Sequence, residues 1–170
     1  LYFAYHLGAY RFLDSQFLAL AQGLETLHRR TSSELSMSES DFEKMLSEIL
    51  DNCPPTHKEW LKMKLYFANE LSLRKRLQDL FEPYIDVFGN KKDIKDIIDK
   101  IVTTRNYLTH YSLELKERSS TGSELLKIVK CMEALFIIRF LEIIGLDKEN
   151  LIEITKTSPI LIRNFKYIKN

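Results

Sequence analysis

The segment 123–144 is the part of the sequence that most constrains the fold. Its second half, from Ala134 onward, is the most apolar stretch of the chain, but it is shorter than a membrane-spanning helix and contains Arg139 and Glu142. A helix that is apolar on nearly every side must be covered by other elements on all of those sides. The sequence therefore predicts a central core helix that ends at a glycine, Gly145.

The rest of the chain shows the spacing of amphipathic helices. A long first helix is expected from Phe3 to Arg30, because apolar residues recur there at steps of three and four. No strand-like alternation of useful length and no internal repeat occurs, so we expect an all-α fold. Further helices are expected at 41–51, 56–71, 73–81, from 92 to about 110, 148–154 and 159–168. Capping boxes are expected to open three helices, formed by Ser40 with Glu43, Thr56 with Glu59, and Thr121 with Glu124.

Length and composition limit the classes of protein that fit. A chain of 170 residues with 45% hydrophobic content can form a substantial core, so we expect a single domain over residues 1–170. The net charge of +1 provides no field that would attract nucleic acid to the whole molecule, so RNA contacts must come from local clustering. Because helical spacing already runs at Leu1, we expect the chain to be the carboxy-terminal part of a longer protein.

No cofactor or metal site is expected. Cys53 and Cys131 lie outside any CxxC or Cys/His cluster, so they are interpreted as buried thiols in a reducing cytoplasm. Met63 and the aromatic residues near it have helical spacing, which indicates core packing and not a cofactor site. The run Arg-Lys-Arg at 74–76 is the one dense basic stretch, for which a solvated helix face and a nucleic-acid contact both stay open.

Arg105, Asn106 and His110 are the candidate functional residues. At 100° per residue, Arg105 falls in the middle of the apolar stripe of its helix, where an ion is costly unless it meets a partner or a polar cavity. Asn106 and His110 are four residues apart, so they are neighbours on a face beside the arginine. A guanidinium suits a phosphate and an imidazole transfers protons near neutral pH, so this set fits a site that acts on a phosphodiester.

A purely structural role for the same residues stays open. Arg105 could reach from the rim of the core to a nearby carboxylate, and His110 could interact with the carboxy-terminal end of the helix dipole. The spacing of an arginine five residues before a histidine is also short enough to arise by chance. Glu25 is a weaker candidate partner for Arg105, since an ion pair with Arg29 one turn away is its alternative.

The segment from Arg105 to His110 resembles the R-x(4–6)-H signature of HEPN domains, including the polar residue after the arginine. The segment 17–29, FLALAQGLETLHR, is similar to the first helix of the Apea-like HEPN group, which occurs in prokaryotic anti-phage and abortive-infection proteins. The resemblance covers most of residues 17–145. It implies a HEPN-like helical bundle with a long first helix and a central apolar helix, and a metal-independent endoribonuclease.

In the HEPN domains that this chain resembles, two copies meet about a two-fold axis with both motifs facing one cleft. The resemblance implies that His110 acts as acid or base, that Arg105 holds and neutralises the scissile phosphate, and that Asn106 orients a hydroxyl or the phosphate. RNA, with tRNA as one candidate, would be cut to a 2′,3′-cyclic phosphate and a 5′-hydroxyl. The implied partners are RNA, a second copy of the chain and an amino-terminal sensor domain, and no membrane.

A non-catalytic role remains the alternative. Many HEPN-like domains serve for dimerisation or for contact with a nucleotidyltransferase or sensor domain, and a domain of that class would dimerise without cutting RNA. A metal-dependent hydrolase lacks support, because no His, Asp and Glu residues have the spacing of metal ligands. Cleavage of RNA by the wild type but not by Arg105→Ala would separate the nuclease from the binding module.

Overall fold

The computed structural model describes residues 12–169, with side chains up to Lys166. Helices make up most of this part of the chain, and its one strand-like contact is an isolated bridge between Leu35 and Glu70. The all-α prediction is therefore confirmed. Residues 3–11 of the predicted first helix lie outside the described residues, and the helix ends at Thr31, close to the predicted end.

The chain divides into two compact units, and the single domain over residues 1–170 stays a prediction. The smaller unit is Thr31–Ser72, and the larger unit comprises the residues before and after it. The elements of the larger unit, in chain order, are α2 (Leu13–Thr31), α5 (Leu73–Phe81), a 3-10 turn (Glu82–Tyr84), α6 (Ile85–Phe88), α7 (Lys91–His110), α8 (Leu113–Lys116), α9 (Gly122–Ile143), α10 (Lys148–Thr157) and α11 (Pro159–Lys169).

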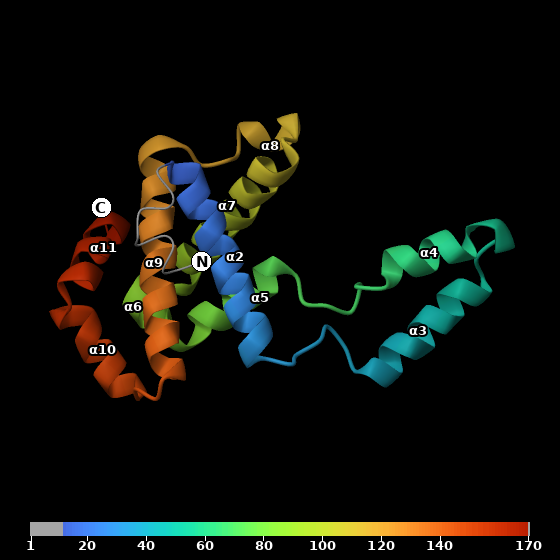
Figure 1. The fold of residues 1–170 in the computed structure, drawn as a ribbon, viewed down its shortest axis with the longest axis horizontal. Helices are drawn as coiled ribbons and strands as arrows, with labels where there is room; N and C mark the ends of the chain where they lie inside the picture. Colours follow the sequence, from blue (N-terminus) through green and yellow to red (C-terminus); the bar gives the residue numbers. More distant parts are fainter. Residues whose placement is uncertain (1–11, 170) are drawn as a thin grey trace. The chain divides into compact units, whose positions relative to one another are not determined.

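Helix α9 forms the centre of the larger unit, as the sequence predicts (Figure 1). It packs against α5, α7, α10 and α11, so buried residues such as Leu125, Met132 and Ile138 occur on several of its sides. The predicted end at Gly145 is confirmed: this glycine has φ 105°, a backbone conformation that L side chains rarely adopt. No helix among the described residues is long and apolar enough to cross a membrane.

Helix α2 packs closely on α9 through a glycine. The predicted apolar positions Phe17, Leu20 and Leu24 are buried in the core. Between them, a Cβ added at Gly23 would lie 3.3 Å from Cε2 of Phe136. The absence of a side chain at Gly23 therefore lets the two helices approach each other at this level.

The smaller unit is a helical hairpin of α3 (Glu39–Asp51) and α4 (Lys58–Leu65), with a 3-10 turn (Pro55–His57) between them. The side chain of Asn69, which follows α4, joins the chain just before α3. It accepts a hydrogen bond from the Met37 N–H at 3.0 Å and donates one to the Met37 carbonyl at 3.2 Å. The helices α3 and α4 contact each other. Neither helix has a buried residue.

The prediction that Met63 and its aromatic neighbours are core residues is wrong. Met63 is 71% exposed and Trp60 is 58% exposed, because two short helices cannot enclose more than one apolar stripe between them. The predicted third helix also ends earlier, at Leu65 instead of about Leu71. Cys53, expected to be buried, is half-exposed, whereas Cys131 is buried as expected.

Each of the three predicted capping boxes differs from the structure. The N-cap of α3 is Ser38, whose Oγ accepts from the Asp41 N–H at 3.1 Å, so the helix starts before the predicted Ser40. Helix α4 begins after His57, whose side chain makes no cap bond. Thr121 does occupy the N-cap of α9, but its side chain makes no cap bond either. The helix starts were therefore better predicted than the bonds that cap them.

Candidate active site at the end of helix α7

The start and the buried face of α7 set the position of the predicted motif. Asn90 caps the helix with a full capping box, in which its Oδ1 accepts from the Asp93 N–H at 3.0 Å and the Asp93 carboxylate accepts from the Asn90 N–H at 3.2 Å. The helix then runs from Lys91 to His110, so one continuous element carries all three motif residues. Its buried residues are Ile94, Ile98, Ile101 and Thr104.

Arg105 lies at the rim of the core and not in the middle of the buried face. The fully buried residue of its turn is Thr104, which is 1% exposed. The Thr104 Oγ1 accepts a hydrogen bond from the Ser120 N–H at 2.9 Å, so the loop before α9 covers this side of the helix. The position expected from 100° per residue requires that the apolar stripe continue straight along the helix. The contact with Ser120 instead places Thr104, one residue earlier, on the buried face.

The side chains of Arg105 and Asn106 are in contact. The Arg105 Nη1 donates a hydrogen bond to the Asn106 Oδ1 at 3.2 Å, and both residues are half-buried. No described residue forms an ion pair with Arg105, so the carboxylate partner of the structural alternative is not found in this part of the chain. Glu25 pairs instead with Arg29, at 3.1 Å, as its alternative reading predicted.

His110 is the last residue of α7 and is exposed. Its imidazole makes no hydrogen bond to Arg105 or Asn106. The backbone of Tyr111 ends the helix, because this residue has φ 51° and ψ 35°, in the left-handed region, and its N–H donates to the Tyr107 carbonyl at 2.7 Å. The cap is therefore a backbone feature, and the imidazole remains at the surface.

The contact between Arg105 and Asn106 leaves other hydrogen-bond donors of both side chains without a partner among the described residues. The contact between them occupies Oδ1 of Asn106, so its Nδ2 amide group remains a donor without a partner among the described residues. The guanidinium likewise keeps N–H groups that no carboxylate occupies. Donors side by side on a half-exposed surface fit an anion such as a phosphate.

An ion pair joins the motif helix to the central helix. The Lys100 ammonium donates a hydrogen bond to the Glu124 carboxylate, which connects α7 to the first turn of α9. This bond holds the pKa of Glu124 below its usual value. Lys100 lies one turn before Thr104 on α7, so the pair adds a second contact between α7 and the start of α9.

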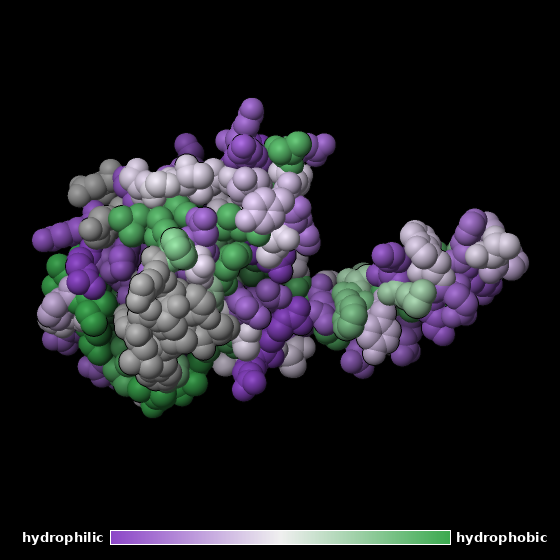
Figure 2. All heavy atoms as spheres, turned by 45° about the horizontal axis from the view of Figure 1, so that its top comes forward, coloured by the Kyte–Doolittle hydropathy of each residue, from purple (hydrophilic) through white to green (hydrophobic). Residues whose placement is uncertain are grey.

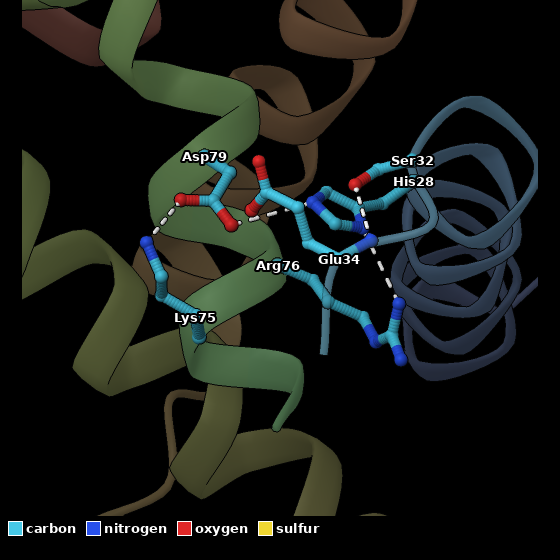
Figure 3. A network of polar contacts seen from close by, with 6 residues as sticks. All are labelled: His28, Ser32, Glu34, Lys75, Arg76 and Asp79. Carbon is cyan, nitrogen blue, oxygen red and sulfur yellow. Dashed lines mark hydrogen bonds and ion pairs between the residues drawn. The ribbon is translucent and has the colours of Figure 1, made fainter. Parts of the chain in front are cut away.

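Each cation of the basic run at 74–76 has a partner within the larger unit. Arg74 forms an ion pair with Asp99, and the Lys75 Nζ lies 2.6 Å from the Asp79 Oδ1. Arg76 is 4% exposed, and its Nη1 lies 3.3 Å from the Nδ1 of His28, which is equally buried (Figure 3). The interpretation as a solvated face is therefore wrong for Arg76, and all three cations have partners.

Sequence reasoning did not identify the cluster of His28, Arg76 and Asp79. A signal for it exists, because Arg76 lies three residues after Leu73 and directly before Leu77, on the stripe that α5 buries. Figure 3 shows the imidazole of His28 between the Arg76 guanidinium and the Asp79 carboxylate. This cluster connects the end of α2 to α5 and lies apart from the motif in the sequence.

Within residues 12–169, no group of three or more His, Cys, Asp and Glu side chains could hold a metal ion. Burial raises the pKa of the Cys131 thiol to about 12, so this cysteine stays protonated and is a poor nucleophile.

The family comparison assigns the chain. A family model described as Apea-like HEPN matches residues 18–150, more than half of the chain, and this range includes α2 and the whole of α7. The chain belongs to the Apea-like HEPN family. Membership in this family points to a nuclease or defence-related role, and Arg105, Asn106 and His110 lie inside the matched range. No curated protein and no solved structure matches the chain.

Proposed function

We propose that this HEPN protein is a metal-independent endoribonuclease that acts in anti-phage defence in the cytoplasm, with an active site formed across a homodimer. The observation that carries the proposal is the state of Arg105. Its guanidinium is half-exposed, has no carboxylate partner among the described residues and lies beside the Asn106 amide, on the helix that ends in an exposed His110. A cation kept unpaired at this position is suited to bind a phosphate.

The chemistry explains why two copies are needed. Cleavage of RNA without a metal requires a base for the 2′-hydroxyl, an acid for the 5′-oxygen, and charge stabilisation on the phosphorus oxygens. One chain offers one imidazole, and residues five apart on a helix are separated by a rise of about 7.5 Å. A two-fold dimer with both motifs at one cleft supplies two imidazoles and two guanidinium groups.

The proposed roles follow from the donors that each residue carries. His110 is the acid or base, because a histidine side chain can give or take a proton in catalysis and this one is exposed. Arg105 binds the scissile phosphate and offsets its growing charge, and the Nδ2 group of Asn106 orients that phosphate or a hydroxyl. The expected products are RNA ends with a 2′,3′-cyclic phosphate and a 5′-hydroxyl.

Cleavage of total RNA and tRNA in the presence of a chelator tests the proposal. We expect His110→Ala and Arg105→Ala each to lower the cleavage rate by at least about 100-fold, with dimer mass unchanged. Matched controls are His57→Ala and Arg118→Ala, which remove an exposed histidine and an exposed arginine elsewhere. Full activity of His110→Ala would refute the assignment.

The alternative is a non-catalytic dimerisation or partner-binding module. The exposed apolar side chains of the α3–α4 hairpin favour it, because such surfaces mark contacts with other proteins. If the wild type and Arg105→Ala both dimerise, and neither protein cuts total RNA or tRNA, the result would support this module against the nuclease.

A further inference from the structure

The α3–α4 hairpin carries an apolar surface that its own residues do not cover. On α4 and the turn after it, Trp60, Met63 and Phe67 are 58%, 71% and 67% exposed, and they are spaced three and four residues apart. On α3, Met45 and Ile49 are also exposed and lie four residues apart. Figure 2 shows apolar and charged side chains side by side on the surface of this hairpin.

The hairpin has too little cover to be stable in water on its own. The best protected apolar residues of its helices, such as Phe42, Leu46 and Leu61, are only half-buried. Helix α3 has 13 residues and α4 has 8, and isolated helices of such lengths are marginal in water. A second apolar surface packed against the hairpin would supply the missing core.

The charges of the two helices restrict what this second surface can be. Acidic residues predominate on α3, which has Lys44 as its single basic residue. Basic residues predominate on α4, which has Glu59 as its single acidic residue. The acidic residues of α3 are Glu39, Asp41, Glu43, Glu48 and Asp51, and the basic residues of α4 are Lys58, Lys62 and Lys64.

We propose that the hairpin binds the same hairpin of a second copy, with α3 of each chain against α4 of the other. The result is a four-helix bundle in which each acidic helix lies between two basic ones. The other two-fold arrangement would set α3 against α3 and α4 against α4, which places like charges opposite each other. The exposed apolar residues of both chains, Trp60 and Met63 among them, form the core of this bundle.

This hairpin contact shares with the proposed function the need for a second copy, but it does not depend on RNA chemistry. It lies on α3 and α4, whereas the proposed active site lies at the end of α7. The residues of the two surfaces do not overlap, so each can be altered without changing the other. The two proposals can therefore fail separately.

Trp60 reports on the contact directly, because it is the single tryptophan of the chain. A dilution series of the full chain is followed by sedimentation, which gives the mass, and by tryptophan emission, which reports burial of the indole. We expect the emission to shift to shorter wavelength, and iodide quenching to fall, as the dimer forms. A dimer with Trp60 still exposed would overturn the proposal, and so would a chain that stays monomeric or a monomer with Trp60 already buried.

Two sets of variants test the geometry of the contact. Met63→Glu should raise the dissociation constant of the dimer at least about tenfold, whereas Ile144→Glu, at a residue 59% exposed in the larger unit, should leave it unchanged. A chain with Glu43→Lys and Glu48→Lys, and one with Lys62→Glu and Lys64→Glu, should each dimerise poorly alone. Mixed together, they should form a heterodimer, because opposite charges again face each other.

The outcomes separate this proposal from the nuclease. Circular dichroism on each variant ensures that loss of dimer is not loss of helix. If Met63→Glu or either charge variant alone dimerises like the wild type, or if the two charge variants fail to associate when mixed, the hairpin contact is overturned. Cleavage that depends on His110 would still leave the nuclease intact. If Trp60 becomes buried in the dimer and His110→Ala still cuts RNA, the nuclease fails and the hairpin contact stands.

Discussion

The guanidinium of Arg76 donates a hydrogen bond to the imidazole of His28 inside the larger unit, with 3.3 Å between Nη1 and Nδ1. Arginine can only donate, so Nδ1 of His28 must accept, and its ring proton is on Nε2. That nitrogen lies 3.4 Å from the Asp79 Oδ2. His28 on α2 thus lies between two residues of α5, Arg76 on its Nδ1 side and Asp79 on its Nε2 side. These two neighbours set the ring tautomer of the histidine.

Replacement of Arg76 should therefore cost stability. We expect Arg76→Met to lower the free energy of unfolding by about 2–4 kcal/mol, because it leaves His28 Nδ1 without this donor in a buried place. Chemical denaturation of the two proteins measures the difference. Arg118→Met, at an exposed arginine, is the matched control and should change stability by no more than about 0.5 kcal/mol. Equal losses in the two variants would contradict the structural role.

Arg105 and Thr104 should respond in opposite ways although they are adjacent. Arg105 is half-exposed and has no ion pair with a described residue, so Arg105→Ala should cost less than about 1 kcal/mol of stability while RNA cleavage is lost. Thr104→Val keeps the shape but removes the acceptor of the buried Ser120 N–H, which should cost about 1–3 kcal/mol. Thermal unfolding and a cleavage assay on both variants measure these effects, and a large stability loss in Arg105→Ala would argue for a structural arginine.

The ion pair between Lys100 and Glu124 should make part of the stability depend on pH. The hydrogen bond from Lys100 lowers the pKa of Glu124 in the folded chain, so the folded state favours the carboxylate. This stabilisation is present above the pKa of the unfolded chain and is lost as the pH falls through the lower, folded value. Both side chains are almost half exposed, so the effect should be below about 1 kcal/mol.

The comparison of wild type with Glu124→Gln at neutral pH and at an acid pH below the folded-state pKa of Glu124 measures that contribution. The wild type should have the higher melting temperature at neutral pH, and the difference should vanish in acid. Glu117→Gln, at an exposed glutamate, is the control and should melt like the wild type at both pH values. A difference that persists unchanged in acid would contradict the ion pair as its source.

Asn164 offers a stabilising substitution. It is 0% exposed, and its Nδ2 and Oδ1 have no hydrogen-bond partner among the described residues. Because a buried amide without partners costs free energy, Asn164→Leu, which is similar in size and apolar, should raise the free energy of unfolding by about 1–2 kcal/mol. Denaturant titration measures the change. Asn164→Ala removes the same polar atoms but leaves a void, and should gain less.

The sequence by itself determined the all-α fold, the places of most helices and the burial of the central helix. The apolar segment that becomes α9 predicts its own burial, since a helix without a polar side has to be covered. Gly145 marks the end of the central helix correctly, because a left-handed glycine after a helix is decided by a few neighbouring residues. The placement of Arg105, Asn106 and His110 on one helix was also predicted, because it depends only on residues close to them in the sequence.

Only the tertiary structure decided which face of each helix is covered. Arg76 is buried because His28, distant in sequence, meets it there, although a basic run suggests solvent. Thr104 and not Arg105 faces inward because Ser120 binds it. Trp60 and Met63 have the spacing of core residues but lie exposed, since a hairpin this short has no further layer of its own to cover them. Periodicity shows that a helix has an apolar side, and burial depends on what packs against that side.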